Sequence, residues 1–178
     1  MIKNNLISQI GPIMQIAFVP NDFDAAVKHW TEVMGVGPFF WIEKAVLENA
    51  MFNGTPSESE FGLALAYWGD IQIELIKQHN EAPSIYNTQP WAGVGGVHHV
   101  CLLAENIDDA KDKAEASKTK LVFTADVPGG GGVFYADCGG GVGLVEVLQP
   151  ADGTSDFFGM IKAASLNRDG SDPFRPLG

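Results

Sequence analysis

The strongest constraint on the fold of this chain is an internal repeat. An apolar run at residues 13–19 leads into an acidic segment, and a second apolar run at residues 97–103 leads into a similar one. The offset of 84 positions aligns Gln15 with His99 and Asp22 with Asn106. Because a repeated sequence builds a repeated structural unit, the two halves should share one topology.

The pattern in each half predicts one strand, one helix and three further strands. Asp22 and Asn106 are suitable N-cap residues, so we expect helices over residues 23–34 and 107–117. Further strand signals cover residues 38–46, 60–68 and 71–76 in the first half, and 121–123, 133–136 and 142–148 in the second. The order βαβββ therefore occurs twice, which predicts an α+β fold.

The length of 178 residues suits a single domain over residues 1–178. Within it we expect a first module at residues 10–80, a linker at 81–96 and a second module at 97–150. Residues 151–178 should add a C-terminal helix, over residues 156–166, and a tail that is rich in Gly and Pro.

The charge balance argues against several classes of partner. The chain has 11 basic and 22 acidic residues, a net charge of −11, whereas nucleic acids and anionic membranes bind basic faces. No apolar run approaches the roughly 20 residues that cross a bilayer, and the N-terminus does not resemble a secretory signal. Cys101 and Cys138 form no CxxC pattern and are expected to be free thiols. We therefore expect a cytoplasmic protein with no nucleic-acid or membrane partner.

Two acidic residues interrupt strands that are otherwise apolar. Residues 71–76 align with residues 143–148, which places Glu74 on Glu146. An ionised carboxylate among Ile, Leu and Val costs several kcal/mol to desolvate unless it is paired or metal-bound. One such residue alone would fit a solvent-facing strand position. Two at equivalent positions, together with the equivalent pair Gln15 and His99, favour a metal site, because carboxylate, imidazole and amide oxygen are metal-ligand chemistry.

Several segments carry a resemblance to a known family: residues 11–13, 35–40, 92–101, 105–110 and 137–146. With the paired βαβββ pattern, they resemble the vicinal oxygen chelate superfamily, which includes glyoxalase I, methylmalonyl-CoA epimerase, extradiol dioxygenases and the bleomycin resistance proteins. The segments themselves are similar to the epimerase branch. The resemblance implies a curved mixed β-sheet, a half-barrel with helices outside, and a homodimer.

The resemblance also implies a ligand set for one divalent metal ion: Gln15, Glu74, His99 and Glu146. Ligands of nitrogen and oxygen type suit Zn, Ni, Co, Mn or Fe. The epimerase branch usually has histidine at the position of Gln15, and the set Gln, Glu, His, Glu is that of glyoxalase I in animals. The flanking sequence and the ligand set therefore favour different branches.

We expect catalysis by proton transfer next to a polarised carbonyl. A divalent metal stabilises a developing enolate, and Glu146, with Glu74 as the second choice, is the expected catalytic base. The first hypothesis is an isomerase, epimerase or lyase that acts on a small carbonyl compound. An acyl-CoA epimerase is one enzyme of this kind. The alternatives are a glyoxalase I-like lyase acting on a thiol hemithioacetal and a non-catalytic protein that binds a small molecule or antibiotic.

Strand alternation predicts which residues line the substrate cavity. Side chains alternate between the two faces of a strand, so Ala17, Gln72 and Cys101 should share the face of the ligands. Trp68 and Tyr135 are aromatic candidates for the same cavity. His98 precedes His99 in the strand and should point to the opposite face, as a structural or supporting histidine.

Overall fold

The computed structural model describes residues 6–92, 95–140 and 143–177. The first half contains β1 (Ile13–Phe18), α1 (Phe23–Lys28), β2 (Phe39–Ile42), β5 (Phe61–Trp68) and β6 (Ile71–Gln78). The second half contains β7 (Val97–Leu103), α2 (Ile107–Ala116), β8 (Lys120–Val127), β9 (Gly131–Asp137) and β10 (Leu144–Gln149). Two βαβββ modules are therefore present, and the α+β prediction is confirmed.

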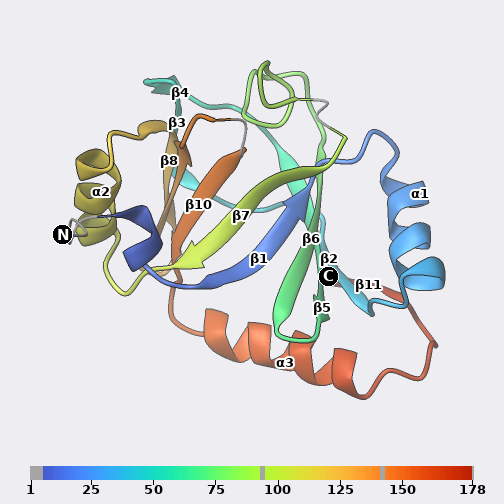
Figure 1. Ribbon diagram of the computed structural model, residues 1–178. Helices are drawn as coiled ribbons and strands as arrows, with labels where there is room; N and C mark the ends of the chain where they lie inside the picture. The colour runs from blue at the N-terminus through green and yellow to red at the C-terminus, as the bar shows by residue number, and fades with distance from the viewer. Residues whose placement is uncertain (1–5, 93–94, 141–142, 178) are drawn as a thin grey trace.

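Six of the described elements lie outside this repeated pattern. They are a 3₁₀ turn at Ile7–Gln9, a π-helical turn at His29–Val33 that extends α1, the short strands β3 (Glu48–Phe52) and β4 (Thr55–Pro56), the helix α3 (Thr154–Leu166) and the strand β11 (Phe174–Leu177). All strands of the described residues belong to one curved sheet with the order β11-β2-β5-β6-β1-β7-β10-β9-β8-β3-β4 (Figure 1).

The two modules meet at the antiparallel pair β1–β7 in the middle of the sheet. Gln15 lies opposite Cys101, and Ala17 lies opposite His99. The sequence repeat aligns Gln15 with His99 and Ala17 with Cys101, so this pairing has an approximate two-fold symmetry. The parallel neighbours β6 and β10 flank the pair on its two sides and extend the same symmetry.

The helix starts follow the predicted caps. The Asp22 side chain accepts a hydrogen bond from the Ala25 amide, and the Asn106 side chain accepts from the amides of Asp108 and Asp109. These bonds satisfy amides that have no partner within the first turn of a helix. The helix predicted over residues 23–34 differs in one respect, because its α-helical part ends at Lys28 and a π-helical turn continues it to Val33.

The strand predicted over residues 38–46 is wrong in its second half. The strand β2 ends at Ile42, and residues 43–60, here called the strap, leave the first module and cross to the second. There β3 pairs with β8, the outer strand of the second module. Asn53 and Gly54 form the tight turn between β3 and β4, and both have the positive φ values of 48° and 81° that such a turn requires.

Other strand boundaries differ less. The strand predicted over 121–123 extends over the whole of β8, and the one predicted from residue 142 begins at Leu144, with residue 142 itself outside the described residues. The Gly- and Pro-rich tail contains β11, which pairs in parallel with β2 at the edge of the sheet. Pro176 is tolerated there because an edge strand has amides that need no ladder partner.

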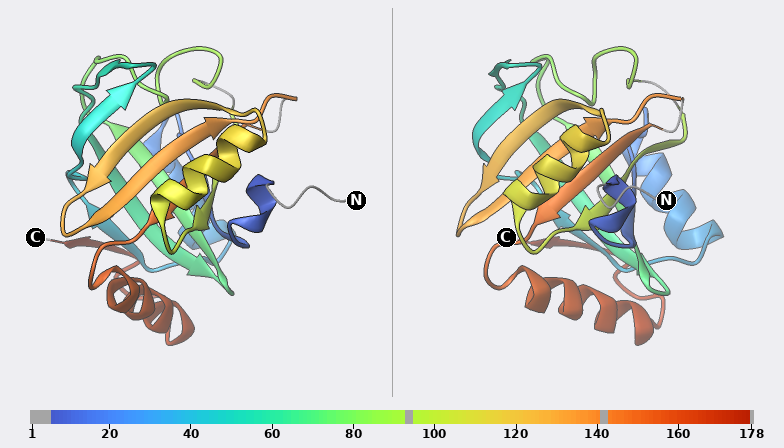
Figure 2. Two further views of the ribbon diagram at one scale, coloured as in Figure 1. Left: turned by 90° about the vertical axis from the view of Figure 1, so that its left-hand side faces the viewer. Right: turned by 60° about the vertical axis from the view of Figure 1, so that its left-hand side comes forward.

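The three α-helices cover different parts of the sheet. On the outer face, α1 packs over an apolar layer that includes Ile73 and Leu75, and α2 packs over a layer that includes Phe134 and Val147. Figure 2 shows α2 lying across the outside of the second module, with α3 across the lower end of the sheet. The helix α3 packs against β2 and β5, where Phe157 and Phe158 belong to the same apolar cluster as Leu65.

The concave face of the sheet contains the central apolar cluster, to which Ala17, Phe61 and Tyr135 belong. Ile85 and Tyr86, from the segment predicted to be a linker, are buried in the same cluster. None of the described helices is long and apolar enough to cross a membrane.

Candidate metal centre

The four predicted metal ligands lie on the four central strands. Across the sheet, Ala17 separates Glu74 from His99, because Ala17 pairs with Glu74 on one side and with His99 on the other. In the same way, Cys101 separates Gln15 from Glu146. The two intervening residues have small side chains, so the longer side chains on either side can reach over them.

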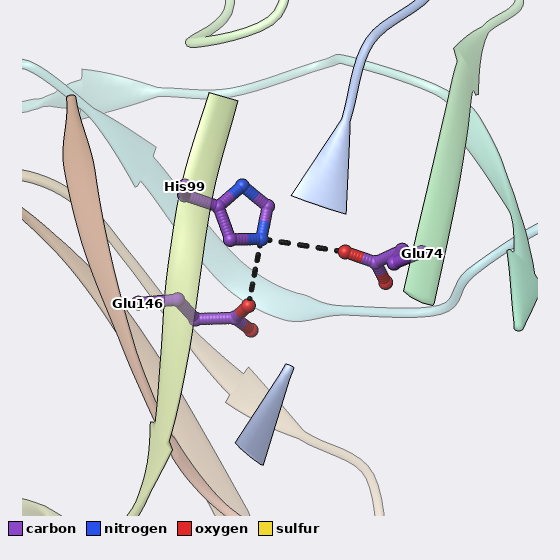
Figure 3. A group of neighbouring side chains, drawn as sticks. All are labelled: Glu74, His99 and Glu146. Carbon is purple, nitrogen blue, oxygen red and sulfur yellow. Dashed lines mark ion pairs between the residues drawn. The ribbon is translucent and has the colours of Figure 1, made fainter. Parts of the chain in front are cut away.

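Three of the ligands converge on one point (Figure 3). The Nε2 atom of His99 lies 3.0 Å from Oε2 of Glu146 and 3.3 Å from Oε2 of Glu74. Ligand atoms of all three residues lie within 4.8 Å of one another, and all three residues are buried. Two carboxylates and an imidazole at these distances are a suitable donor set for a divalent cation.

The hydrogen bonding of His99 provides an independent test of this fit. Although two carboxylates lie close by, the buried Nε2 atom has no hydrogen-bond partner among the described residues. A buried polar atom without a partner costs free energy and calls for an explanation. A cation bound between Nε2 and the two carboxylates would satisfy it, so the residues fit a metal ion.

Gln15 is the fourth predicted ligand. Its Nε2 atom donates a hydrogen bond of 2.7 Å to Oε1 of Gln72, which is itself fully buried. This bond engages the amide nitrogen, which has no lone pair for a cation, and leaves the amide oxygen for that role. Gln72, which we expected to line the cavity, is not among the residues that line it and instead contacts a candidate ligand.

Burial and mutual charge shift the titration of these groups. Burial raises the pKa of the Glu74 carboxyl, and the charge of Glu146 raises it further, against the opposing effect of His99. Burial alone would lower the pKa of His99, but the carboxylates of Glu146 and Glu74 outweigh it and raise the pKa to about 9. In the metal-free protein the cluster therefore retains a proton at neutral pH.

This proton makes metal affinity depend on pH. A cation has to displace the proton from His99 at any pH below about 9, so the apparent affinity for zinc should rise by about tenfold per pH unit up to that pH. Above it the affinity should level off. Calorimetry in buffers with different ionisation enthalpies would measure the proton released, and a zinc affinity that stays constant between pH 6.5 and pH 9 would contradict this expectation.

His98 contacts the His99 ring on the side away from the carboxylates, and its position differs from the prediction. The two imidazole rings are in contact, with Nδ1 of His98 2.9 Å from Nδ1 of His99 and ring centroids 5.2 Å apart. The prediction that they occupy opposite faces is therefore wrong. The reason is an irregularity in the β1–β7 ladder between Ala17 and Phe18, which adds a residue on β7 and disturbs the alternation of side chains.

The contacts of His98 determine the tautomer of His99. Burial, with the neighbouring His99, lowers the pKa of His98 to about 4, so this ring is neutral at pH 7 and has one N–H group. Its Nε2 lies 2.9 Å from the carbonyl oxygen of Ile85, which can only accept, so Nε2 has the proton. Nδ1 of His98 then accepts from Nδ1–H of His99. A neutral His99 is left with its lone pair on Nε2, facing the two carboxylates.

Removing this support should weaken metal binding. We expect His98→Phe to lower zinc affinity by about 10–100-fold, because outer partners of a metal-binding histidine fix its tautomer and orientation. In His98→Asn, Oδ1 can still accept from His99, so affinity should recover in part. Competition with a chelator would measure both variants, and unchanged affinity in His98→Phe would show that His99 needs no such partner.

A cavity of about 270 Å³ opens in front of the cluster. Gln15, Glu74 and Glu146 line one part of it, and Tyr135 lines it beside them. The Tyr135 ring lies 5.0 Å from the His99 ring between centroids, and its hydroxyl lies 3.4 Å from that of Tyr86. Burial raises the pKa of the Tyr135 phenol well above its usual range, so the hydroxyl stays protonated.

The remaining predicted cavity residues lie in different places. Ala17 and Cys101 are buried on β1 and β7, each between two proposed ligands, and neither is among the residues that line the cavity. Burial also raises the pKa of the Cys101 thiol well above its usual range, which leaves it unreactive. Trp68 does not line the cavity: its surface is 57% exposed and its ring packs edge-on against Trp30.

Sequence reasoning missed two parts of the cavity wall. Phe157 and Phe158 of α3 line it on one side, and Lys44 to Leu47 of the strap line it on another. Nothing in the sequence pattern of α3 connects it to the ligands. The dipeptide Asn53–Gly54, a strong signal for a two-residue hairpin turn, would have revealed the β3–β4 hairpin within the strap.

Comparison with known families identifies the superfamily of this chain. Residues 14–136 match the model of the Glyoxalase/Bleomycin resistance protein/Dioxygenase superfamily. The chain belongs to this superfamily, which confirms the resemblance noted in the sequence. No curated protein sequence matches the chain significantly.

Solved structures of similar fold include three of interest, all of low sequence identity. A hypothetical protein from Bacillus halodurans has 14% identity and a TM-score of 0.55, over 79% of this chain and 95% of that one. Methylmalonyl-CoA epimerase from Mycobacterium tuberculosis has 12% identity and a TM-score of 0.53, over 88% and 97%. The Streptomyces coelicolor epimerase in complex with 2-nitronate-propionyl-CoA has 18% identity and a TM-score of 0.54, over 80% and 99%. At these identities the likeness extends to the fold alone.

Proposed function

We propose that this protein is a divalent-metal-dependent enzyme that removes a proton next to a carbonyl group and proceeds through an enolate, as an isomerase, epimerase or lyase. The observation that carries the proposal is the convergence of the buried Nε2 atom of His99 with the carboxylates of Glu146 and Glu74, at 3.0 Å and 3.3 Å, beside a cavity. One imidazole and two carboxylates at these distances are a donor set for a divalent cation.

His99, Glu74 and Glu146 would hold the metal, together with the amide oxygen of Gln15. Zinc, nickel, cobalt, manganese and iron all accept this donor set. A divalent ion bound there supplies Lewis acidity, which lowers the free energy of a developing enolate by several kcal/mol. The remaining chemistry belongs to the side chains of the cavity.

Glu146 is the proposed catalytic base, with Glu74 as its counterpart. Both carboxylates line the cavity, on strands related by the approximate two-fold symmetry, so they approach a substrate from different sides. Removal of a proton by one and return by the other would invert a stereocentre, and return to a neighbouring atom would give isomerisation. The hydroxyls of Tyr86 and Tyr135 form one hydrogen bond with each other, in which one of them is the donor. The other hydroxyl can then donate a hydrogen bond to a different group.

A glyoxalase I-like lyase is the second candidate. The identity of Gln15 favours it, because the set Gln, Glu, His, Glu matches the animal glyoxalase pattern noted in the sequence. Both candidates share the same proton abstraction, so they differ in substrate and not in the proposed roles of the site residues.

Metal content and proton exchange test the proposal together. Protein expressed with added zinc, manganese, cobalt or nickel should contain one divalent ion per chain. In deuterated water, NMR should then show exchange of the proton next to the carbonyl in a panel of thioesters, hemithioacetals and ketones. One metal per chain without exchange in any substrate class would support the binding-protein alternative, and no metal would contradict the site.

Two further predictions from the sequence remain part of this proposal. We propose a cytoplasmic homodimer that acts on a small-molecule carbonyl substrate. All four proposed ligands come from a single chain, so the dimer is not needed to complete the site. Light scattering would determine the oligomeric state, and a monomer would leave the proposed chemistry unaffected.

A further inference from the structure

The cavity in front of the proposed metal site has an apolar wall. Apart from the proposed ligands, the residues that line it are mainly aliphatic or aromatic, including Leu63, Leu65, Val133, Leu148, Phe157 and Phe158. Its volume of about 270 Å³ lies just below the roughly 300–1,000 Å³ that is common for ligand pockets. A cavity of this kind encloses a small compound with an apolar body.

Among the described residues, none that lines the cavity offers a free positive charge to an anionic substrate. Lys44 is the single cationic residue among those that line it, and its Nζ atom is 2.7 Å from Oε1 of Glu60. The two buried carboxylates of Glu74 and Glu146 already balance the charge of a divalent ion. A substrate with a carboxylate or phosphate inside the cavity would therefore add uncompensated negative charge to an apolar region, which is costly.

The aromatic part of the wall belongs to a firmly attached element. Phe157 and Phe158 are on α3, which lies outside the residues that match the superfamily model. Ile161 anchors this helix and is fully buried. Ser165 Oγ accepts a hydrogen bond from the Tyr67 amide, and Lys162 pairs with Asp70 at 2.7 Å. Figure 1 shows α3 lying along the end of β5 and β6.

We propose that the site takes an uncharged carbonyl compound with an apolar chain, and that Phe157 and Phe158 select this chain. The inference rests on the proposed function, because the carbonyl oxygen would bind the metal held by Glu74, His99 and Glu146. It goes further in assigning the apolar end of the substrate to α3 and in excluding an anionic group from the cavity.

A homologous series of ligands tests this assignment. Vicinal diketones, from diacetyl to homologues with up to four added methylenes, would be titrated into the zinc-loaded protein by calorimetry. Affinity should rise about fourfold for each added methylene, which corresponds to about 0.8 kcal/mol of buried apolar surface. The α-keto acid of the same chain length should bind more weakly than the diketone.

Two variants on α3 test whether Phe158 is responsible for the gain in affinity per methylene. In Phe158→Ala the gain per methylene should fall to less than half, whereas in Met160→Ala, whose side chain is partly exposed on α3, it should be unchanged. A flat affinity series, equal slopes in both variants, or tighter binding of the α-keto acid would each overturn the inference.

The design separates this inference from the proposed function. Zinc binding is measured first, without any organic ligand, and its absence would overturn the proposed metal site. If zinc binds with one ion per chain and the diketone series is flat, only the inference about the substrate fails. The series is then repeated on zinc-free protein. A gain in affinity per methylene there would show that the apolar wall binds the apolar chain of the ligand without the metal.

Discussion

Replacing His99 with alanine is expected to abolish binding of divalent metal ions. The substitution removes the one nitrogen ligand and leaves Glu74 and Glu146 buried near each other without a cation-binding partner between them. Loss of a supporting contact behind a metal-binding histidine already costs about 10–100-fold in affinity, so loss of the ligand itself should cost more than about 100-fold. Titration with zinc in competition with a chromogenic chelator would measure the change.

The control for this variant is His29→Ala, which removes an exposed imidazole on the outer helix. It should bind zinc as the parent protein does. Circular dichroism would establish that both variants fold, and His99→Gln provides a second variant of more similar size if the alanine variant does not. Unchanged zinc stoichiometry in a folded His99→Ala protein would refute the ligand assignment.

Replacing Glu146 with glutamine is expected to remove nearly all proton exchange while leaving some metal binding. An amide oxygen can still bind a cation, as proposed for Gln15, but an amide cannot take up a proton at neutral pH. General bases contribute roughly 10²–10⁴-fold to rates, so exchange should fall by that factor. NMR of deuterium incorporation, at a zinc concentration that saturates the variant, separates the lost base from the weakened affinity.

Two companion variants interpret this result. Glu115→Gln changes an exposed acid on α2 and should leave exchange unchanged. Glu74→Gln should slow exchange less than Glu146→Gln if Glu146 is the principal base, and more if the roles are reversed. Full exchange activity in metal-saturated Glu146→Gln would remove Glu146 from the proposed role of base.

The fold was largely predictable because its main determinant is a repeat. The alignment of Gln15 with His99 and of Glu74 with Glu146 rests on residue types and spacing, and the β1–β7 pairing brings these positions together in the structure. The helix starts at Asp22 and Asn106 were also predictable, since a side-chain cap is a local interaction.

What the sequence did not predict depends on contacts between distant segments. The pairing of β3 with β8 joins residues that are far apart in the chain, and no local pattern specifies the partner of a short strand. The position of His98 depends on an irregularity in the β1–β7 ladder, which the rule of alternating side chains cannot anticipate. The contribution of Phe157 and Phe158 follows from the way in which α3 packs on β5.

The strap has a mechanical consequence for the metal centre. Among the described residues, strands of the two halves pair at two places, through β1–β7 in the middle of the sheet and through β3–β8 at its far side. A hinge motion that separates the two halves would have to break the hydrogen bonds between β3 and β8, so these two attachments oppose it. We therefore expect the spacing between Glu74 and Glu146 to stay the same when a ligand enters the cavity.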